Sequence, residues 1–136
     1  MILSKKCEYA IRALVYLAGS HRAARAREIS ERQKVPYSFA NKVLQELKAK
    51  GFVTSTRGPK GGFALAAPPT AIRLRDVLTA IEGDAVLTGC LYGLSSCSDE
   101  NPCPLHEGWK DVRGRIEAAL FNNTLADLVA PTSPDR

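Results

Sequence analysis

A cluster of turn-forming residues between two short strand-like runs is the feature that most restricts the fold of this chain. The cluster is Arg57-Gly58-Pro59-Lys60-Gly61-Gly62, and it separates residues 52–56 from residues 63–66. Glycine and proline at this density mark a turn, and the two flanking runs are of the length and composition expected of paired strands. The pattern therefore predicts a β-hairpin whose slim tip carries two positive charges.

Helical periodicity flanks this hairpin on both sides. Val35-Pro36 breaks the chain between two of the expected helices, because proline disfavours a helical residue before it. Gly19 is expected to end the first helix. The expected helices are residues 4–18, 26–33 and 37–50 before the hairpin, and 73–82, 106–121 and 125–129 after it. This order predicts a mainly α fold with a small β-hairpin wing, in which a winged helix-turn-helix domain is followed by a long dimerisation helix.

The expected helices divide the chain into four parts. We expect residues 1–83 to form the winged helix-turn-helix domain, 84–104 a cysteine-rich loop, 105–130 the dimerisation helix with a short final helix, and 131–136 a disordered tail. The long helix carries an apolar stripe that needs a partner. A second copy of the chain would give a two-fold dimer, whereas packing against residues 74–81 is the alternative. The stripe consists of Trp109, Val112, Ile116 and Leu120.

The polar face of the predicted helix 37–50 carries groups that can read bases. Ser38, Asn41 and Lys42 share this face. In the major groove of DNA, asparagine can bind adenine, lysine can reach guanine or phosphate, and serine can bond to either. A plain three-helix domain with a solvated polar face is the alternative interpretation of the same residues.

The hairpin tip and the charge distribution favour DNA over this alternative. Arg57 and Lys60 lie on a loop kept slim by glycines that include Gly61, and a slim cationic finger suits the narrow minor groove. Residues 1–66 hold 13 lysine and arginine residues against 4 acidic residues, whereas residues 67–136 hold 6 against 10. A basic half of this kind is expected to bind a polyanion, here double-stranded DNA.

A long loop without apolar periodicity contains three cysteines followed by a histidine. They are Cys90, Cys97, Cys103 and His106, with the spacing C-x6-C-x5-C-x2-H. Thiolates and imidazole are ligands for iron–sulfur clusters and for zinc. Structural zinc sites usually draw ligands from closely spaced pairs, which this spacing lacks. An iron–sulfur cluster, either 2Fe–2S or 4Fe–4S, is therefore favoured over zinc and over a cluster-free thiol switch.

Other functions find little support in the sequence. No apolar run is long enough to span a membrane and the first residues do not read as an export signal, so we expect a cytoplasmic protein without a membrane partner. The glycine cluster leads into a strand rather than a helix, which argues against a phosphate-binding loop. No catalytic triad is visible, so we expect neither an enzyme nor a small-molecule substrate.

Several motifs together resemble the bacterial Rrf-type winged-helix regulators, the IscR/NsrR group. The resemblance covers almost the whole chain and implies a homodimer in which the long helix crosses to the partner. It also implies a promoter-binding repressor or activator, of which we expect a repressor, and a redox-labile iron–sulfur cluster on the three cysteines. The motifs are residues 3–10, 29–33, 53–65, 103–109 and 122–128.

The resemblance offers two candidates for the fourth cluster ligand. His106 matches a histidine that follows the third cysteine in IscR-like members, and Glu8 matches an acidic residue on the first helix of the other subunit in NsrR-like members. The first spacing of six departs from the IscR pattern of five. Two alternatives stay open: a thiol-redox or zinc-binding regulator of the same fold, and a non-regulatory iron–sulfur carrier, which would have no need for the basic hairpin.

Overall fold

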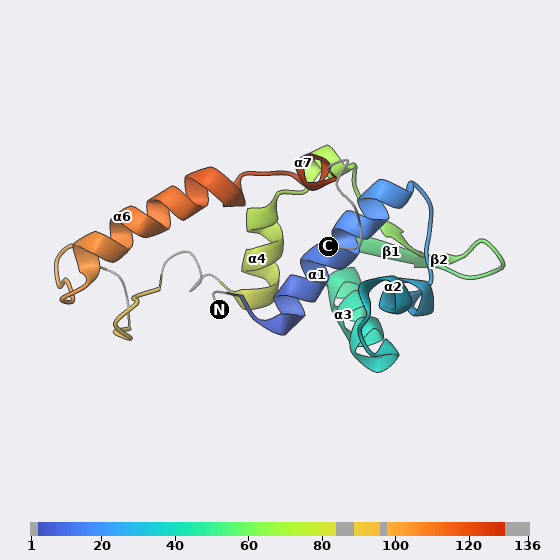
Figure 1. Cartoon of the computed structure of the whole chain (residues 1–136), viewed down its shortest axis with the longest axis horizontal. Coiled ribbons are helices and arrows are strands. Elements are labelled where there is room, and N and C mark those ends of the chain that lie inside the picture. The colour runs from blue at the N-terminus through green and yellow to red at the C-terminus, as the bar shows by residue number, and fades with distance from the viewer. Residues whose placement is uncertain (1–2, 84–88, 96–97, 130–136) are drawn as a thin grey trace.

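The computed structural model describes residues 3–83, 89–95 and 98–129 of the 136-residue chain. It is helical apart from one two-stranded antiparallel hairpin, which confirms the predicted fold class. Cys97 and the predicted tail at 131–136 lie outside the described residues. In chain order (Figure 1) the elements are α1 (Lys5–Ser20), α2 (Ala26–Gln33), α3 (Tyr37–Ala49), β1 (Val53–Thr56), β2 (Gly62–Leu65), the 3-10 turn η1 (Pro69–Ala71), α4 (Leu74–Glu82), α6 (His106–Ile116), the π-helical turn η2 (Glu117–Phe121) and α7 (Leu125–Leu128).

Helices α1, α2 and α3 build the main hydrophobic core. Ser4 begins α1 by accepting a hydrogen bond from the Cys7 amide at 3.1 Å, as expected of an N-cap serine. The helix extends two residues beyond its predicted end at residue 18, because it continues through Gly19 to Ser20 and ends at His21, whose φ of 56° is left-handed. The largest buried side chains of this core are Tyr9, Leu14, Ile29, Leu44 and Leu47.

The hairpin is fixed to the helical core through its second strand. β1 and β2 pair with Val53 opposite Leu65. Phe63 exchanges two backbone hydrogen bonds with Ala24, of 2.9 and 2.7 Å, so the segment between α1 and α2 pairs with β2 on its other edge. Gly62 makes this approach possible, since an added Cβ there would lie 2.6 Å from backbone atoms of Ala24. The direction of the hairpin is therefore set by the core.

The hairpin tip depends on Gly61 for a steric reason. An added Cβ would lie 2.3 Å from the carbonyl oxygen of Thr56 and 2.8 Å from the carbonyl carbon of Arg57. Because both are backbone atoms, we expect Gly61→Ala to distort the tip, to lower the free energy of unfolding by about 1–3 kcal/mol in thermal denaturation, and to weaken DNA binding. Gly114→Ala on α6, where nothing lies within 4 Å, should be neutral or stabilising. Wild-type stability of Gly61→Ala would contradict this account.

The C-terminal part of the chain returns to the helical core near the start of α4. The Leu74 amide donates to the Asn123 carbonyl at 2.8 Å, and the Leu125 amide donates to the Ile72 carbonyl at 2.9 Å. These bonds place α7 against η1 and α1, with Leu125 fully buried. The short final helix is therefore part of the same packed unit as α1.

A second apolar cluster joins η2 to α1 and α4. Cys7, Leu78 and Phe121 are buried in it, and Ile116 packs against them. The helix expected over residues 106–121 is α-helical only as far as Ile116, and its last turn widens to a π-helical turn where Phe121 enters this cluster. From this junction α6 projects away from the winged domain (Figure 1). Neither α6 nor any other helix of the described part is long and apolar enough to cross a membrane.

Candidate nucleic-acid interface and cysteine-rich site

The outward face of α3 borders the hairpin. α2 and α3 are joined by a tight turn at Lys34, whose φ of 58° is left-handed and whose amide caps α2. Ser38 and Lys42 are exposed on α3, and Asn41 is half-buried. Asn41 lines a groove together with Ser55 of β1. The predicted base-reading residues and the hairpin thus share one surface.

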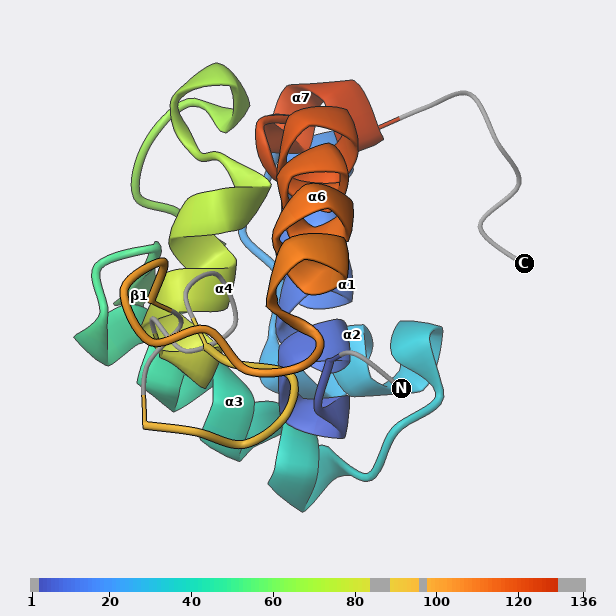
Figure 2. The same cartoon turned by 90° about the vertical axis from the view of Figure 1, so that its left-hand side faces the viewer.

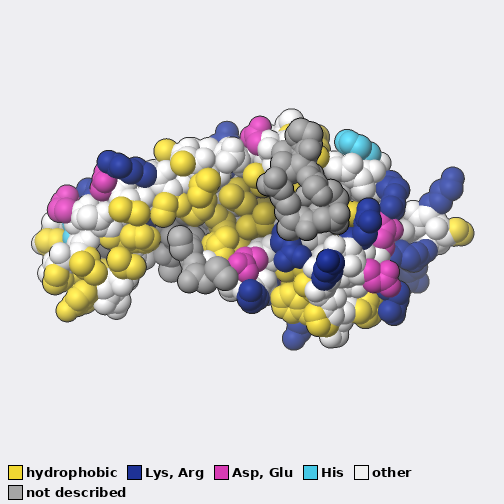
Figure 3. Space-filling view, viewed as in Figure 1, with side chains coloured by type: hydrophobic (Ala, Val, Ile, Leu, Met, Phe, Trp, Pro, Cys, Tyr) yellow, Lys and Arg dark blue, Asp and Glu magenta, His cyan; other side chains and the backbone are white. Residues whose placement is uncertain are grey.

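The predicted charges of the hairpin point outward. Arg57 and Lys60 are exposed at the tip, and Gly61 is buried beneath them. Figure 3 shows lysine and arginine side chains gathered over the end of the molecule that carries the hairpin. An exposed cationic tip beside a polar helix face is the arrangement that phosphate and base contacts require.

Two arginines that the sequence analysis missed extend this surface. Arg25 donates a hydrogen bond to the Gly58 carbonyl at the hairpin tip, and the Arg27 guanidinium lies 4.5 Å from the centroid of the Tyr37 ring. Both arginines stand at the start of α2, where the helix dipole disfavours positive charge. They line the same groove as Asn41. Arginines in this unfavourable position are a sequence signal for an anionic partner.

Cys90 and Cys103 come together in the loop before α6. Their sulfur atoms are 3.6 Å apart, and both residues are half-buried. Two thiolates bound to one tetrahedral metal through bonds of about 2.3 Å lie about 3.8 Å apart. The sulfur pair therefore fits two ligands of one iron or zinc atom. The third predicted thiol ligand, Cys97, lies outside the described residues.

Neighbouring hydrogen bonds stabilise the thiolate of Cys90. Desolvation raises its pKa, but hydrogen bonds from the Leu94 amide, the Cys103 thiol and the amides of Tyr92 and Gly93 outweigh this effect, so the pKa of Cys90 lies below its ordinary value. The thiolate is the form that binds metals and reacts with oxidants. The Cys90 thiol is therefore suited both to metal binding and to reaction with oxidants.

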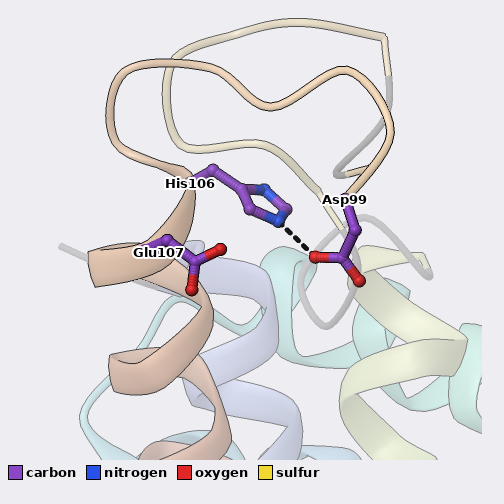
Figure 4. A group of neighbouring side chains, drawn as sticks. All are labelled: Asp99, His106 and Glu107. Carbon is purple, nitrogen blue, oxygen red and sulfur yellow. Dashed lines mark hydrogen bonds and ion pairs between the residues drawn. The ribbon is translucent and has the colours of Figure 1, made fainter.

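The predicted ligand His106 is the first residue of α6 and is only 4% exposed. Its Nε2 bonds to Asp99 Oδ1 at 2.7 Å, as Figure 4 shows. The hydrogen bond from His106, followed by that from Lys110, holds the pKa of the Asp99 carboxyl below its ordinary value. Oxygen atoms of Glu107 and Asp99 and a ring nitrogen of His106 lie within 4.8 Å of one another. The Lys110 ammonium, 2.9 Å from Asp99 Oδ1, opposes a separate cation at this place.

The first turns of α6 hold the described parts of the loop in place. Trp109 Nε1 donates to the carbonyl of Gly89 at 2.9 Å, and Gly89 directly precedes Cys90. The His106 amide donates to the Cys103 carbonyl at 3.1 Å. Figure 2 faces this end of the molecule and shows the loop at the start of α6. The helix thus acts as a scaffold on which two of the cysteine-bearing segments are arranged.

The other candidate ligand, Glu8, lies on α1. Its carboxylate pairs with Lys5 Nζ at 3.6 Å and is 28% exposed. α1 belongs to the winged domain, whereas the cysteine loop lies at the outer end of α6 (Figure 1). Within one chain, the backbone of His106 is hydrogen-bonded to that of Cys103, whereas Glu8 lies on α1. A contribution from Glu8 requires a second subunit.

Cys7 has the opposite environment to Cys90. Burial raises the pKa of the Cys7 thiol to about 12, and the charges of Glu82 and Glu8 add to the shift. Because the thiolate is the reactive form, we expect iodoacetamide at about pH 8 to alkylate Cys90 in the folded, metal-free chain and to leave Cys7 unmodified. Mass spectrometry of peptides measures both. Equal rates for the two cysteines would show that Cys7 is accessible.

Comparisons with known sequences identify the family of this chain. The model of the Rrf2 family, described as an iron-dependent transcriptional regulator, matches residues 3–131. The HTH-type transcriptional regulator IscR of Yersinia pseudotuberculosis (serotype O:1b, strain IP 31758) is 36% identical over 131 residues, which are 95% of this chain and 79% of that relative. These matches confirm the resemblance noted in the sequence.

Solved structures share the fold as well. CymR (YrzC), the global cysteine regulator of B. subtilis, superposes with a TM-score of 0.77 at 25% identity, covering 96% of this chain and 98% of that one. IscR of T. potens superposes with a TM-score of 0.74 at 26% identity, covering 93% and 85%. Sequence and fold agree, and this chain therefore belongs to the Rrf2 family of DNA-binding transcriptional regulators rather than to a family of enzymes.

Proposed function

We propose that this chain represses transcription under the control of an iron–sulfur cluster bound by Cys90, Cys97 and Cys103, with His106 as the fourth ligand. The observation that carries the proposal is the close approach of the Cys90 and Cys103 sulfur atoms, which lie 3.6 Å apart. The pKa of the Cys90 thiol is also lowered by its hydrogen bonds. The family's description as iron-dependent and the 36% identity to IscR support the same assignment. When bound, such a cluster supplies a centre that oxidants, nitric oxide or iron shortage can alter.

The fourth ligand is assigned to His106 because it is buried and its backbone bonds to Cys103. Metal-binding histidines are neutral and usually have a second partner on the ring, which Asp99 provides here. Glu8 of the partner subunit is the alternative ligand. The two differ in that His106 would complete the site within one chain, whereas Glu8 would complete it only in a dimer.

Contacts at the base of α6 offer a route from the cysteine loop to the DNA-binding surface. Glu117 pairs with Arg75 of α4 at 3.4 Å and with Arg113 of α6 at 4.0 Å. Phe121 packs with Leu78 in the second apolar cluster. We propose that a tilt of α6 is transmitted to the base-reading face through these contacts, because α4 packs on α1 and α1 packs on α3. Gain or loss of the cluster can act through such a tilt.

We propose that the DNA contacts come from one face of each chain. Asn41, Ser38 and Lys42 of α3 are assigned to the major groove, and the hairpin tip is assigned to the minor groove. The half-buried position of Asn41 in the groove beside β1 supports its role in base reading, since it places the amide on the surface that α3 shares with the hairpin. The tip residues are Arg57 and Lys60, with Gly61 shaping the turn, and Arg25 and Arg27 adjoin them.

We also propose a two-fold homodimer formed through residues 105–130, with residues 1–83 binding DNA and 84–104 holding the cluster. Val112 and Leu120 are 47% and 52% exposed, whereas Ile116 packs inside its own chain. Figure 3 shows hydrophobic side chains along α6 and toward α4. Contiguous apolar surface of this kind usually marks an interface. A dimer would read two half-sites spaced by roughly 34–36 Å.

The dimer predicts the effect of charges on α6. We expect the double change Val112→Asp and Leu120→Asp to convert dimers to monomers in analytical sedimentation at micromolar concentration, because a buried interface cannot accommodate unpaired carboxylates. Tyr37→Asp, which charges an exposed apolar side chain at the start of α3 in the winged domain, should leave the dimer intact. A wild-type chain that sediments as a monomer would contradict the proposal.

Anaerobic purification tests the cluster itself. We expect visible absorption, iron and acid-labile sulfide in the protein, and a change in promoter affinity when a chelator removes the cluster. The counts of iron and sulfide per chain distinguish 2Fe–2S from 4Fe–4S. Bound zinc without visible absorption would assign a zinc site instead. A wild-type chain that is free of metal when prepared without oxygen would overturn the cluster proposal.

A thiol switch without a cluster is the second candidate function. The sulfur pair of Cys90 and Cys103, 3.6 Å apart, favours it. In this case the two thiols would form a disulfide, releasing two protons and two electrons to an oxidant such as hydrogen peroxide, which is reduced to water. Peptide mass spectrometry after peroxide treatment, together with DNA binding before and after reduction, tests this candidate.

A further inference from the structure

The side chain of Asp99 links the cysteine loop to α6. Asp99 lies two residues after Cys97, and its Oδ1 bonds to His106 Nε2 at 2.7 Å. Lys110 Nζ lies 2.9 Å from Oδ1 and 3.1 Å from Oδ2, so both oxygens have a partner on α6. His106 is 4% exposed, whereas Asp99 is 67% exposed in its side chain. An exposed carboxylate is thus held in one position over a buried imidazole.

This arrangement selects one form of the imidazole ring. A carboxylate only accepts hydrogen bonds, so the ring nitrogen that faces it carries the proton. In neutral His106 the proton is therefore on Nε2, and Nδ1 keeps its lone pair. Histidines that bind metals usually donate their other ring N–H to a carboxylate, which fixes the ring and makes the ligand nitrogen more basic.

We propose that Asp99 is a positioning residue that holds His106 as the Nε2–H tautomer, so that Nδ1 is the nitrogen that binds the cluster. This inference rests on the proposed function, because it concerns the fourth ligand of the same site. Lys110 contributes by fixing the carboxylate from the next turn of α6. The fold of the loop and the electronic character of the ligand are then set by the same hydrogen bond.

The metal-free protein tests the first half of the proposal. Two-bond 15N–1H NMR correlations of the imidazole distinguish the two tautomers, and we expect Nε2–H for His106 with a downfield proton signal from the bond to the carboxylate. Asp99→Asn should move this signal upfield. Glu100→Gln removes the same charge from the adjacent exposed residue and should leave the signal unchanged. An Nδ1–H tautomer in the wild type, or equal effects of the two variants, would overturn the proposal.

The cluster-loaded protein tests the second half. With histidine labelled by 15N at Nδ1 alone, we expect strong nitrogen hyperfine coupling in the reduced protein, whereas binding through Nε2 would overturn the proposal. Asp99→Asn should raise the midpoint potential and shorten the lifetime of the cluster in air, and Glu100→Gln should change neither. A wild type that never binds a cluster would overturn the proposed function as well, while a cluster bound through Nε2 would overturn only this inference.

Discussion

Cys103→Ser is expected to remove the visible absorption and the bound iron of the anaerobically purified protein. The serine hydroxyl stays protonated near neutral pH, so it cannot replace a thiolate ligand. The effect should be large because Cys103 lies next to Cys90, with 3.6 Å between the sulfur atoms, and its carbonyl accepts the amide of His106. Loss of the Cys103 thiol therefore removes one ligand and also changes the surroundings of two other proposed ligands, Cys90 and His106. Absorption spectra and iron analysis measure the result directly.

Cys7→Ala is the matched control for this experiment. Cys7 is fully buried in the second apolar cluster, and its thiol has a pKa of about 12, so it is not available as a ligand. We expect the variant to retain iron and absorption, with a loss in stability on the order of 1 kcal/mol. Cys103→Ser with wild-type iron content would contradict the ligand assignment. Loss of iron from both variants would instead indicate that the fold, rather than a ligand, had been damaged.

The fold could be predicted from the sequence where local signals and packing agree. The helix at residues 26–33 was predicted with the bounds that the structure shows, because the break at Val35-Pro36 and the apolar position Ile29 both act locally. The helix at 106–121 was predicted as one unbroken element. Its last turn is wider because Phe121 enters a cluster with Leu78, a residue more than 40 positions away in the chain. Such packing cannot be read from local periodicity.

In the candidate sites, too, some residues could be selected from local sequence, whereas others depend on contacts with distant residues. Residue type and spacing selected Cys90, Cys103 and His106 as candidates, because their chemistry is carried by the side chains themselves, and their role as ligands stays a prediction. Asp99 was not selected, because an isolated aspartate in a loop gains a role only through its contact with His106. Arg25 was missed for a similar reason, since its hydrogen-bond partner at Gly58 is 33 residues away.

Arg57→Ala is expected to weaken promoter binding strongly. Arg57 is exposed at the hairpin tip, where it can neutralise phosphate or enter the minor groove. Each phosphate contact contributes about 0.9 to the slope of log affinity against log salt, which corresponds to a factor of about five at ~0.15 M salt. A dimer loses two such contacts, so we expect a loss of about 30-fold, or about 2 kcal/mol, and a shallower salt dependence. Fluorescence anisotropy across a salt series measures both quantities.

Arg115→Ala is the control that distinguishes loss of a specific DNA contact by Arg57 from a general loss of positive charge. Arg115 is 81% exposed on α6, where it pairs with Asp111, and its removal changes the net charge by the same amount. We expect its affinity and salt dependence to remain near those of the wild type. If Arg115→Ala weakened binding as much as Arg57→Ala, the hairpin would contribute only to the general field of the protein.

Asn41→Ala is expected to give a different signature, because Asn41 is assigned to a base rather than to phosphate. We expect preference among operator variants to relax by about 1–3 kcal/mol while the salt dependence stays that of the wild type. If Asn41→Ala loses sequence preference and keeps the salt dependence of the wild type, Asn41 contacts a base edge. If Arg57→Ala has a shallower salt dependence and keeps the sequence preference, Arg57 contacts the DNA backbone. Wild-type behaviour of both variants would contradict the assigned surface, because the assignment requires a base contact from Asn41 and a backbone contact from Arg57.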